Sequence, residues 1–194
     1  MPNVRGRALI ARAQFAEERC GPGSWQRIVE GLPATAQKAI GKIDPRGWYP
    51  MEIYGFLQDA VARLVGGAKD DALEQLGAYS ADQNAEAIFG KLSGDAFEFF
   101  KHIAKLHRDL FDFGEMTVLR RPGGCLIQVD YIGRAEASVC KSARGFYRRC
   151  AELNGARNVA VEMLECQARG DGSCLFKVTW KKIRRTITRP PTSS

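Results

Sequence analysis

A change in hydrophobic periodicity near residue 113 constrains the fold of this chain more than any other feature. Before it, apolar residues recur every three or four positions, as in Leu57 and Val61, which is typical of helices that pack on a core. After it, apolar residues alternate with polar ones, as in Cys125 and Ile127, which is typical of strands with one buried face. The sequence therefore predicts a helical part followed by a sheet part.

The sheet part is expected to contain two hairpins with a helix between them. The first hairpin turns at 121–124, the helix covers about 134–154, and the second hairpin runs from Val159 to Trp180. This order predicts an antiparallel sheet whose crossover helix covers one face, with the N-terminal helices packed beyond it. We therefore predict an α+β fold, in which an N-terminal helical bundle packs on a C-terminal antiparallel sheet of hairpin-helix-hairpin order.

Length and charge are those of a single domain with a basic end. A chain of 194 residues can bury one core without disulfides. The net charge is +7, but five of these charges follow the last strand, so the folded body is close to balanced and we do not expect nucleic acid as a partner. The predicted domain covers 1–180, with a helical part at 1–112, a sheet part at 113–180 and a basic tail at 181–194.

Neither a membrane span nor a secretion signal is expected. No stretch reaches the roughly 18 consecutive apolar residues that a spanning helix needs. Charged residues interrupt the N-terminal segment before an apolar signal region could form. We therefore expect a cytoplasmic protein, in which the six cysteines are free thiols or metal ligands rather than disulfides.

Three cysteines of the sheet part are candidate metal ligands. If the last hairpin has a three-residue loop centred on Asp171, Cys166 and Cys174 share one sheet face about 7 Å apart. Cys140 lies in the crossover helix, which could bring a third thiol over the same face. Zn²⁺ prefers four tetrahedral ligands, and a nearby glutamate, a histidine or water could complete the set. Buried, chemically inert thiols explain the same pattern, so both interpretations stay open.

These cysteines lie within motifs that resemble a known family. They resemble the 4-vinyl-reductase-like domain, which is a relative of the heme-NO-binding domain and of the Golgi-transport (TRAPP) subunits. The resemblance rests on Cys140, Gly145-Phe146, Val161-Glu162, the segment Cys166 to Asp171, and Cys174-Leu175-Phe176. Uncharacterised single-domain proteins known mainly from myxobacteria resemble the chain more narrowly, at Val4-Arg5-Gly6, Gly47 to Pro50, Tyr79-Ser80 and Phe111 to Gly114.

The resemblance implies a fold that binds a molecule rather than one that catalyses a reaction. Relatives hold small hydrocarbons, tetrapyrroles or acyl chains between the helices and the sheet, and many are sensors or assembly subunits. In relatives that sense aromatic hydrocarbons, cysteines matching the three named above hold a structural zinc together with a glutamate three residues before the second cysteine. Met163 stands at that position here, so Glu162 or Glu165 would have to substitute for the glutamate, or zinc is absent.

Heme is not expected from the motifs. Heme-NO-binding relatives use a proximal histidine and a Tyr-x-Ser-x-Arg motif that grips the heme carboxylates, and the sequence lacks this motif. His107 lies on an apolar stripe with Phe100 and Ile103, where it could face a ligand or be a hydrogen-bonded core residue. His102 falls on the other side of that helix and is expected to face solvent.

Three functions follow from these patterns, in order of preference. The first is a cytoplasmic, non-enzymatic module that binds a small hydrophobic molecule as a sensor or regulator, in a cavity near Trp48, Phe100 and His107. The second is a protein-interaction or assembly subunit without a ligand, which forms a homodimer or binds a protein partner. The third is a tetrapyrrole-related enzyme, although the two histidines in one helix provide no convincing pair of base and nucleophile.

Overall fold

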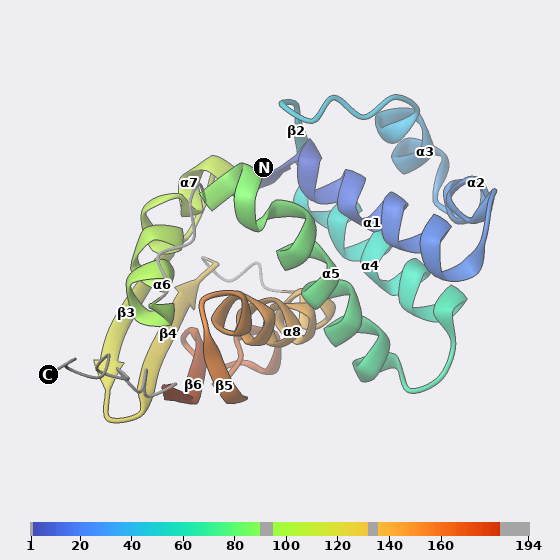
Figure 1. Ribbon diagram of the computed structural model, residues 1–194. Coiled ribbons are helices and arrows are strands. Elements are labelled where there is room, and N and C mark those ends of the chain that lie inside the picture. Colours follow the sequence, from blue (N-terminus) through green and yellow to red (C-terminus); the bar gives the residue numbers. More distant parts are fainter. Residues whose placement is uncertain (1, 90–94, 132–135, 183–194) are drawn as a thin grey trace, which may run out of the picture.

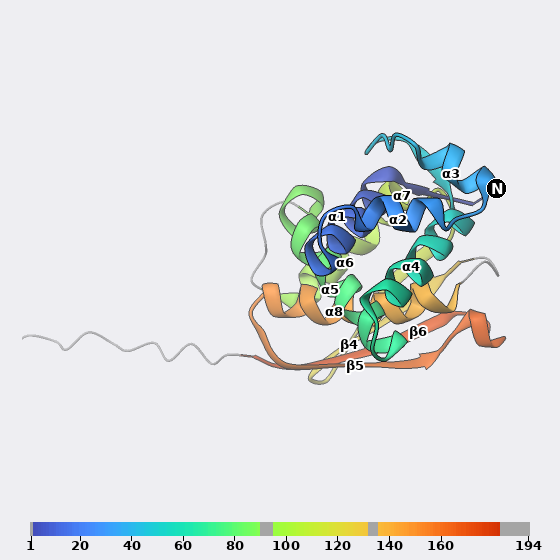
Figure 2. The same cartoon turned by 90° about the vertical axis from the view of Figure 1, so that its right-hand side faces the viewer.

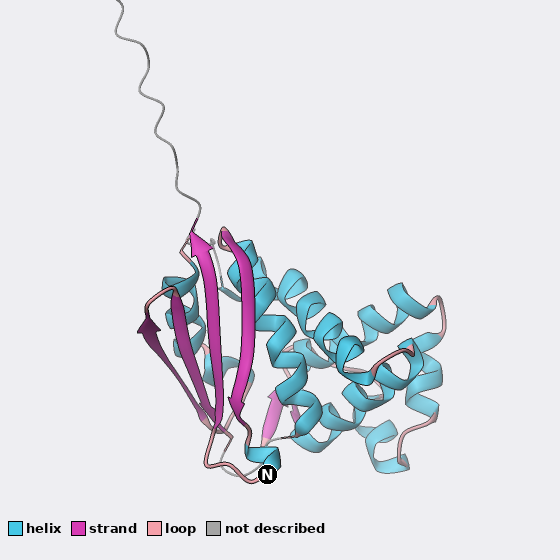
Figure 3. Ribbon diagram, turned by 90° about the horizontal axis from the view of Figure 1, so that it is seen from below, coloured by secondary structure: helices cyan, strands magenta, loops and turns pink. Residues whose placement is uncertain are grey.

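A four-stranded antiparallel sheet forms one layer of the molecule, and helices cover one of its faces (Figure 1). The computed structural model describes residues 2–89, 95–131 and 136–182. Seen edge-on, the sheet has its helices on a single side (Figure 2), and its other face is open (Figure 3). The predicted α+β fold, with helices packed on an antiparallel sheet, is confirmed.

The sheet has the strand order β3-β4-β6-β5, with each neighbouring pair antiparallel. A single register row crosses all four strands on the covered face, through Val118, Ile127, Phe176 and Met163. Ile127 and Phe176, on the two central strands, are fully buried. The strands are β3 (Glu115–Arg121), β4 (Gly124–Asp130), β5 (Ala156–Glu165) and β6 (Cys174–Lys182).

The crossover helix between the two hairpins lies directly on the sheet, as the sequence predicts. It is α8 (Ala137–Leu153), and its buried residues include Val139, Cys140 and Tyr147. The ring of Tyr147 packs edge-on against Phe176 at 5.2 Å between ring centroids. Three helices precede the sheet in the sequence and lie closest to α8 and β3. They are α5 (Lys69–Phe89), α6 (Ala96–Lys105) and the short α7 (His107–Leu110).

The N-terminal half consists of helices that pack beyond α5, away from the sheet (Figure 1). They are α1 (Gly6–Cys20), α2 (Ser24–Glu30), α3 (Ala34–Ile40) and α4 (Met51–Val65). Two three-residue strands, β1 (Asn3–Arg5) and β2 (Trp48–Pro50), pair antiparallel beside them. The periodicity predicted neither strand, since a three-residue strand is too short to show alternation.

Helices α5 and α8 cross at very close range because each has a glycine at the contact. A Cβ atom on Gly77 would lie 1.8 Å from the carbonyl oxygen of Ser142 on α8. A Cβ atom on Gly145 would lie 1.8 Å from the carbonyl oxygen of Glu74 on α5. The two backbones therefore touch, and α5 holds α8 against the sheet.

Two further observations concern membranes and the chain end. Among the residues that the structure describes, no helix is both long and apolar enough to cross a bilayer. β6 ends at Lys182, so the predicted basic tail at 181–194 lies almost entirely outside the described residues. The proposed division into a helical part at 1–112 and a sheet part at 113–180 stays a prediction.

Candidate ligand pocket and thiol cluster

A partly enclosed pocket of about 100 Å³ lies between the helices and the sheet. Residues of α1, α4, α5, α6, α7, α8 and β3 contribute to its wall, so it is enclosed by segments that are far apart in the chain. Most of the wall is apolar or aromatic, and it includes Ile103, Leu110, Phe111, Met116, Tyr131, Val139, Phe146 and Tyr147. Such a wall favours a small apolar guest over water.

His107 is the predicted ligand residue that lies in this pocket. It begins α7, its side chain is 6% exposed, and its ring stacks on Phe111 at 5.1 Å between centroids. Its Nε2–H donates a hydrogen bond to the carbonyl oxygen of Phe113 at 3.2 Å, which leaves Nδ1 as an acceptor. Burial lowers the pKa of His107 below its ordinary value, and the nearby Arg108 lowers it further.

The other two predicted ligand residues lie elsewhere, so the predicted cavity near them needs correction. Trp48 is in β2 at the surface, 39% exposed, with the guanidinium of Arg5 stacked 3.6 Å from its ring centroid. Phe100 is fully buried but packs with Tyr147 and Trp180 over the sheet rather than lining the pocket. Side-chain type alone could not separate a core aromatic residue from one in a pocket wall. His102 is exposed, as predicted.

Arg12 is a pocket residue that the sequence analysis missed. It lies on α1, is 3% exposed, and forms part of the pocket wall with Ser80 and Tyr54. The sequence contains a signal for it, because Arg12 falls on the apolar stripe of its helix between Leu9 and Phe15. A charged residue on such a stripe is either paired in the core or functional.

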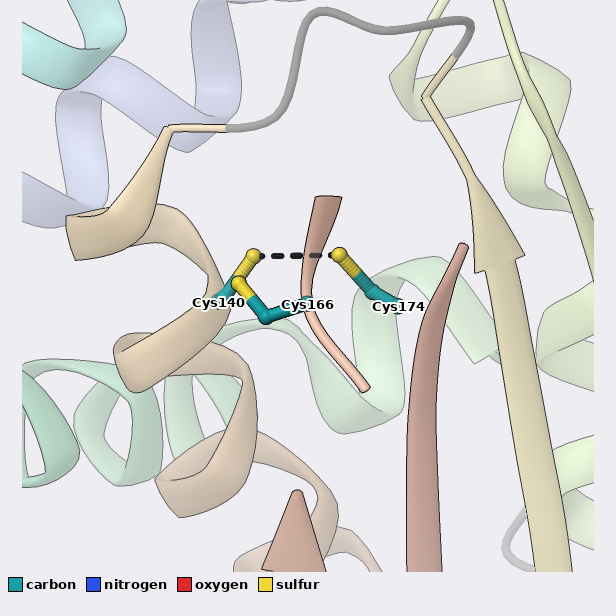
Figure 4. Close-up of side chains that lie close together, drawn as sticks. All are labelled: Cys140, Cys166 and Cys174. Atoms are coloured by element: carbon teal, nitrogen blue, oxygen red, sulfur yellow. Dashed lines mark hydrogen bonds between the residues drawn. The ribbon is translucent and has the colours of Figure 1, made fainter. Parts of the chain in front are cut away.

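The three predicted thiols lie together between α8 and the segments that carry Cys166 and Cys174 (Figure 4). The Sγ atoms of Cys140, Cys166 and Cys174 are within 4.8 Å of one another, and all three residues are buried. Cys140 comes from α8, Cys174 begins β6, and Cys166 lies in the loop between β5 and β6. In a tetrahedral site with metal–sulfur bonds of about 2.3 Å, neighbouring sulfur atoms are about 3.8 Å apart, so this spacing suits one metal ion.

Hydrogen bonds within the cluster favour one thiolate. The Sγ atoms of Cys140 and Cys174 are 3.3 Å apart, and the backbone N–H of Gln167 donates to Cys174 at 3.4 Å. The hydrogen bond between the two thiols lowers the pKa of Cys174 and raises that of Cys140. A thiolate is the form that binds a metal ion.

The loop that carries Cys166 is longer than the predicted three-residue hairpin loop. β5 ends at Glu165, a 3₁₀ turn covers Gln167–Arg169, and Gly170 is left-handed with φ 99°. The carboxylate of Asp171 accepts a hydrogen bond from the backbone N–H of Cys166 at 2.7 Å, which closes the loop. Cys166 therefore folds back toward Cys174, and the predicted separation of about 7 Å is too large.

The two glutamates considered as a fourth ligand do not face the thiols. Glu162 lies on the open face of the sheet, where its carboxylate pairs with Lys177 at 3.6 Å. Glu165 is exposed and accepts a hydrogen bond from the hydroxyl of Ser173 at 3.3 Å. Met163 is half-buried on the covered face, packed against the core. Its thioether is a ligand type that soft metal ions accept.

H-NOX proteins are among the solved structures that have a similar arrangement of helices and sheet. No family model matches this chain, and no curated protein sequence matches it. An H-NOX protein from S. oneidensis in the Fe(II) ligation state superposes with a TM-score of 0.70 at 12% identity, covering 92% of this chain and 96% of that one. Fe(II) unliganded H-NOX from K. algicida gives a TM-score of 0.67 at 12% identity, covering 92% and 97%. This chain has the H-NOX fold.

The match confirms the predicted resemblance to the heme-NO-binding superfamily at the level of fold. The resemblance to 4-vinyl-reductase-like domains stays a prediction, and so does the narrower resemblance to single-domain proteins known mainly from myxobacteria. The expectation against heme is contradicted, because the matched H-NOX structures include Fe(II) and Fe(II)NO proteins, and one further match concerns heme redox potential and porphyrin distortion. Zinc receives no support from these structures.

The pocket of this chain fits heme in its chemistry but not in its size. A buried histidine is a common proximal ligand of heme iron, and His107 supplies one. The volume of about 100 Å³ is well below the roughly 300–1,000 Å³ of pockets for drug-sized ligands. A tetrapyrrole therefore requires a more open pocket than the one described.

Proposed function

We propose that this chain is a non-enzymatic sensor or regulatory module that binds a small apolar ligand in the His107 pocket. The apolar and aromatic wall around one buried histidine carries this proposal. The H-NOX fold, found in Fe(II) and Fe(II)NO proteins, supports it. Ser80 and Ser142 also line the pocket, but their hydroxyls donate to the backbone carbonyls of Leu76 and Val139. No described hydrogen bond joins either hydroxyl to His107, so the described residues form no paired nucleophile and base there.

A ligand in this pocket should stabilise the folded chain in proportion to its occupancy. At about 100 times its dissociation constant, it adds about 2.7 kcal/mol to the free energy of unfolding, which is roughly 5–10 °C in melting temperature. Thermal unfolding with benzene, toluene, phenol and hemin tests this directly. Hemin belongs to the panel because the fold holds iron in other proteins.

A pocket-filling variant identifies where such a ligand binds. Ala143 is a half-buried residue of α8 that lines the pocket, so Ala143→Leu should fill the space and abolish the ligand-induced shift. Ala104 is a half-buried helical alanine outside the pocket wall, and Ala104→Leu should retain the shift. A shift that survives Ala143→Leu, or no shift with any ligand of the panel, would contradict the proposal.

We propose further that Cys140, Cys166 and Cys174 bind one thiophilic metal ion, which ties α8 to the β5–β6 loop. The spacing and burial of the three sulfur atoms support this proposal. Elemental analysis of the purified chain should find one equivalent of metal, and the sulfur-rich set favours a soft ion. Cys174→Ala should lose it.

Cys125 provides a matched control for the metal measurement. It is also a buried cysteine on the covered face, on β4 beside β6, but it lies outside the cluster. Cys125→Ala should therefore keep the full metal content. A wild-type chain without metal, when purified with reductant and without chelator, would leave the three cysteines as core residues and overturn the metal proposal.

One observation favours the second candidate function, an assembly subunit that forms a homodimer or binds a protein partner. Leu119 and Leu164 are 53% and 42% exposed on β3 and β5. On the open face of the sheet, Leu119 lies directly opposite Leu126 of the neighbouring strand β4. Sedimentation of the wild type and of Leu119→Lys tests this surface, and a wild-type monomer at all concentrations would count against a homodimer.

A further inference from the structure

The guanidinium of Arg12 is a buried cation whose described partners are all neutral. No Asp or Glu among the described side chains pairs with it. The phenol ring of Tyr54 lies under it at 4.3 Å from the ring centroid. It donates hydrogen bonds to the carbonyl oxygen of Ala8 at 3.1 Å, Oγ of Ser80 at 2.9 Å, Oε1 of Gln58 at 3.0 Å and the hydroxyl of Tyr54.

An arginine in this setting retains its charge at a cost. Buried charged groups in proteins are generally paired with an opposite charge, because removal from water is expensive. Burial lowers the pKa of Arg12, but a guanidinium stays protonated in proteins near neutral pH. Its Nε–H also lacks a hydrogen-bond partner among the described residues. Within the described part of the chain, the site therefore has both an uncompensated positive charge and an unused donor.

This cation belongs to the wall of the same pocket as His107. The pocket wall contains no acidic side chain among the described residues, and its other polar members are neutral hydroxyl, amide and imidazole groups. The remaining wall is apolar and aromatic. A guest that places an anionic group near Arg12 and an apolar body against Phe146 and Val139 would satisfy both kinds of surface.

We propose that the natural ligand of this pocket is a small carboxylic acid, whose carboxylate pairs with Arg12 and whose short apolar body contacts the aromatic wall. This inference rests on the proposed function and specifies its ligand class. The volume limits the body, since a cavity of about 150 Å³ accommodates benzene and this one is about 100 Å³. Branched short-chain acids are therefore the first probes, and single-ring acids are included because the pocket is partly open and part of a ring can extend beyond it.

Carboxylate and amide probes of the same shape isolate the contribution of charge. The full chain is titrated calorimetrically at pH 7.5 with isovalerate and benzoate, and with isovaleramide and benzamide. Charge-assisted hydrogen bonds should make each acid bind roughly tenfold more tightly than its amide, or better. Because the acids and the amides are all titrated into the wild-type protein, this comparison does not depend on the folding of a variant.

A variant that places a carboxylate of the protein itself beside Arg12 provides the second measurement. The hydroxyl of Ser80 is already 2.9 Å from Arg12, so Ser80→Asp places a carboxylate beside the cation. The preference for acids over amides should then disappear. Ser80→Asn, which is similar in shape and uncharged, should keep it.

The outcomes separate this inference from the function on which it rests. If wild-type protein binds amides or hydrocarbons as tightly as the acids, the carboxylate inference is overturned and the apolar pocket stands. If acids bind preferentially but Ser80→Asp keeps the preference, Arg12 is not the recognising group and the inference also fails. If neither these probes nor the neutral panel binds, the proposed function itself fails.

Discussion

At the scale of single residues, the proposed ligand recognition depends on two buried polar groups. Arg12 adds a positive charge to it, and His107 adds an imidazole whose Nε2–H is held by the carbonyl of Phe113. Both groups have pKa values lowered by burial, which is the cost of placing a titratable group away from water. The presence of both groups in one wall is the basis of the ligand class proposed above.

His107 should make the stability of the protein depend on pH. Its pKa is lower in the folded chain than its unfolded value of about 6.5, so the unfolded chain binds more protons between the two values. Its contribution is therefore complete above about pH 6.5 and is lost as the pH falls toward the folded pKa. The slope cannot exceed about 1.4 kcal/mol per pH unit, which is the limit for one proton.

Urea unfolding between pH 7.5 and pH 5 measures this effect. His107→Gln should flatten the pH dependence, because glutamine is neutral throughout and can still donate to the carbonyl of Phe113. His102→Gln, on the exposed side of α6, is the matched control substitution. Equal slopes for all three proteins would show that His107 does not resist protonation in the folded state.

The residue chemistry was only partly predictable from the sequence. The cysteine positions and the alternating strands indicated that Cys140, Cys166 and Cys174 could meet, and the structure places their sulfur atoms within 4.8 Å of one another. The assumed loop was wrong because a hydrogen bond from Cys166 to Asp171 closes a longer turn. Arg12 lies on the apolar stripe of its helix, but its partners Tyr54 and Ser80 are 42 and 68 positions away, so the sequence did not show that they meet.

At the scale of elements, the contact between α5 and α8 positions both candidate sites. α8 supplies Cys140 to the thiol cluster and Val139, Ala143 and Phe146 to the pocket wall. Its backbone touches α5 at Gly77, where a side chain of any size would meet the carbonyl of Ser142. The position of α8 over the sheet therefore depends on two glycines whose role cannot be read from periodicity.

Gly77→Ala should consequently be destabilising even though alanine favours helices. The added Cβ would lie 1.8 Å from a backbone oxygen, so the helices must separate, at a cost of roughly 1–3 kcal/mol or more. Gly41→Ala is the control, because its Cβ would have only ordinary contacts and its φ is −55°. Denaturant unfolding of both variants measures the difference, and equal stability would contradict the close crossing.

At the scale of the whole molecule, the sequence predicted the helical and sheet layers better than it predicted which residues line the pocket between them. The change of period near residue 113 predicted the sheet and its crossover helix, because local alternation is enough to define a strand. The pocket is lined by residues from Ala8 to Tyr147, so its wall is a product of long-range packing. For the same reason Trp48 and Phe100 were expected in a cavity that they do not line.

The fold leaves the pocket in a position from which its occupancy can affect the whole chain. The wall draws on six helices and on β3, and α8 connects it to the thiol cluster and to the sheet. A guest that orders this wall stabilises the contacts of helices from both halves of the sequence. Such coupling between pocket and packing is what a sensor module requires.

Nuclear magnetic resonance of the ¹⁵N-labelled chain, titrated with benzoate and separately with benzene, tests the central claim most directly. Binding in the pocket should produce saturable shifts of the backbone amides of Gly77, Ile103 and Val139, which lie in three helices of its wall. The chemical shifts of the backbone amides of Gly172 and Leu119, which lie outside the wall, should not change. Shifts confined to residues outside the wall, or no saturable shifts with either compound, would contradict the assignment of this pocket as a ligand site.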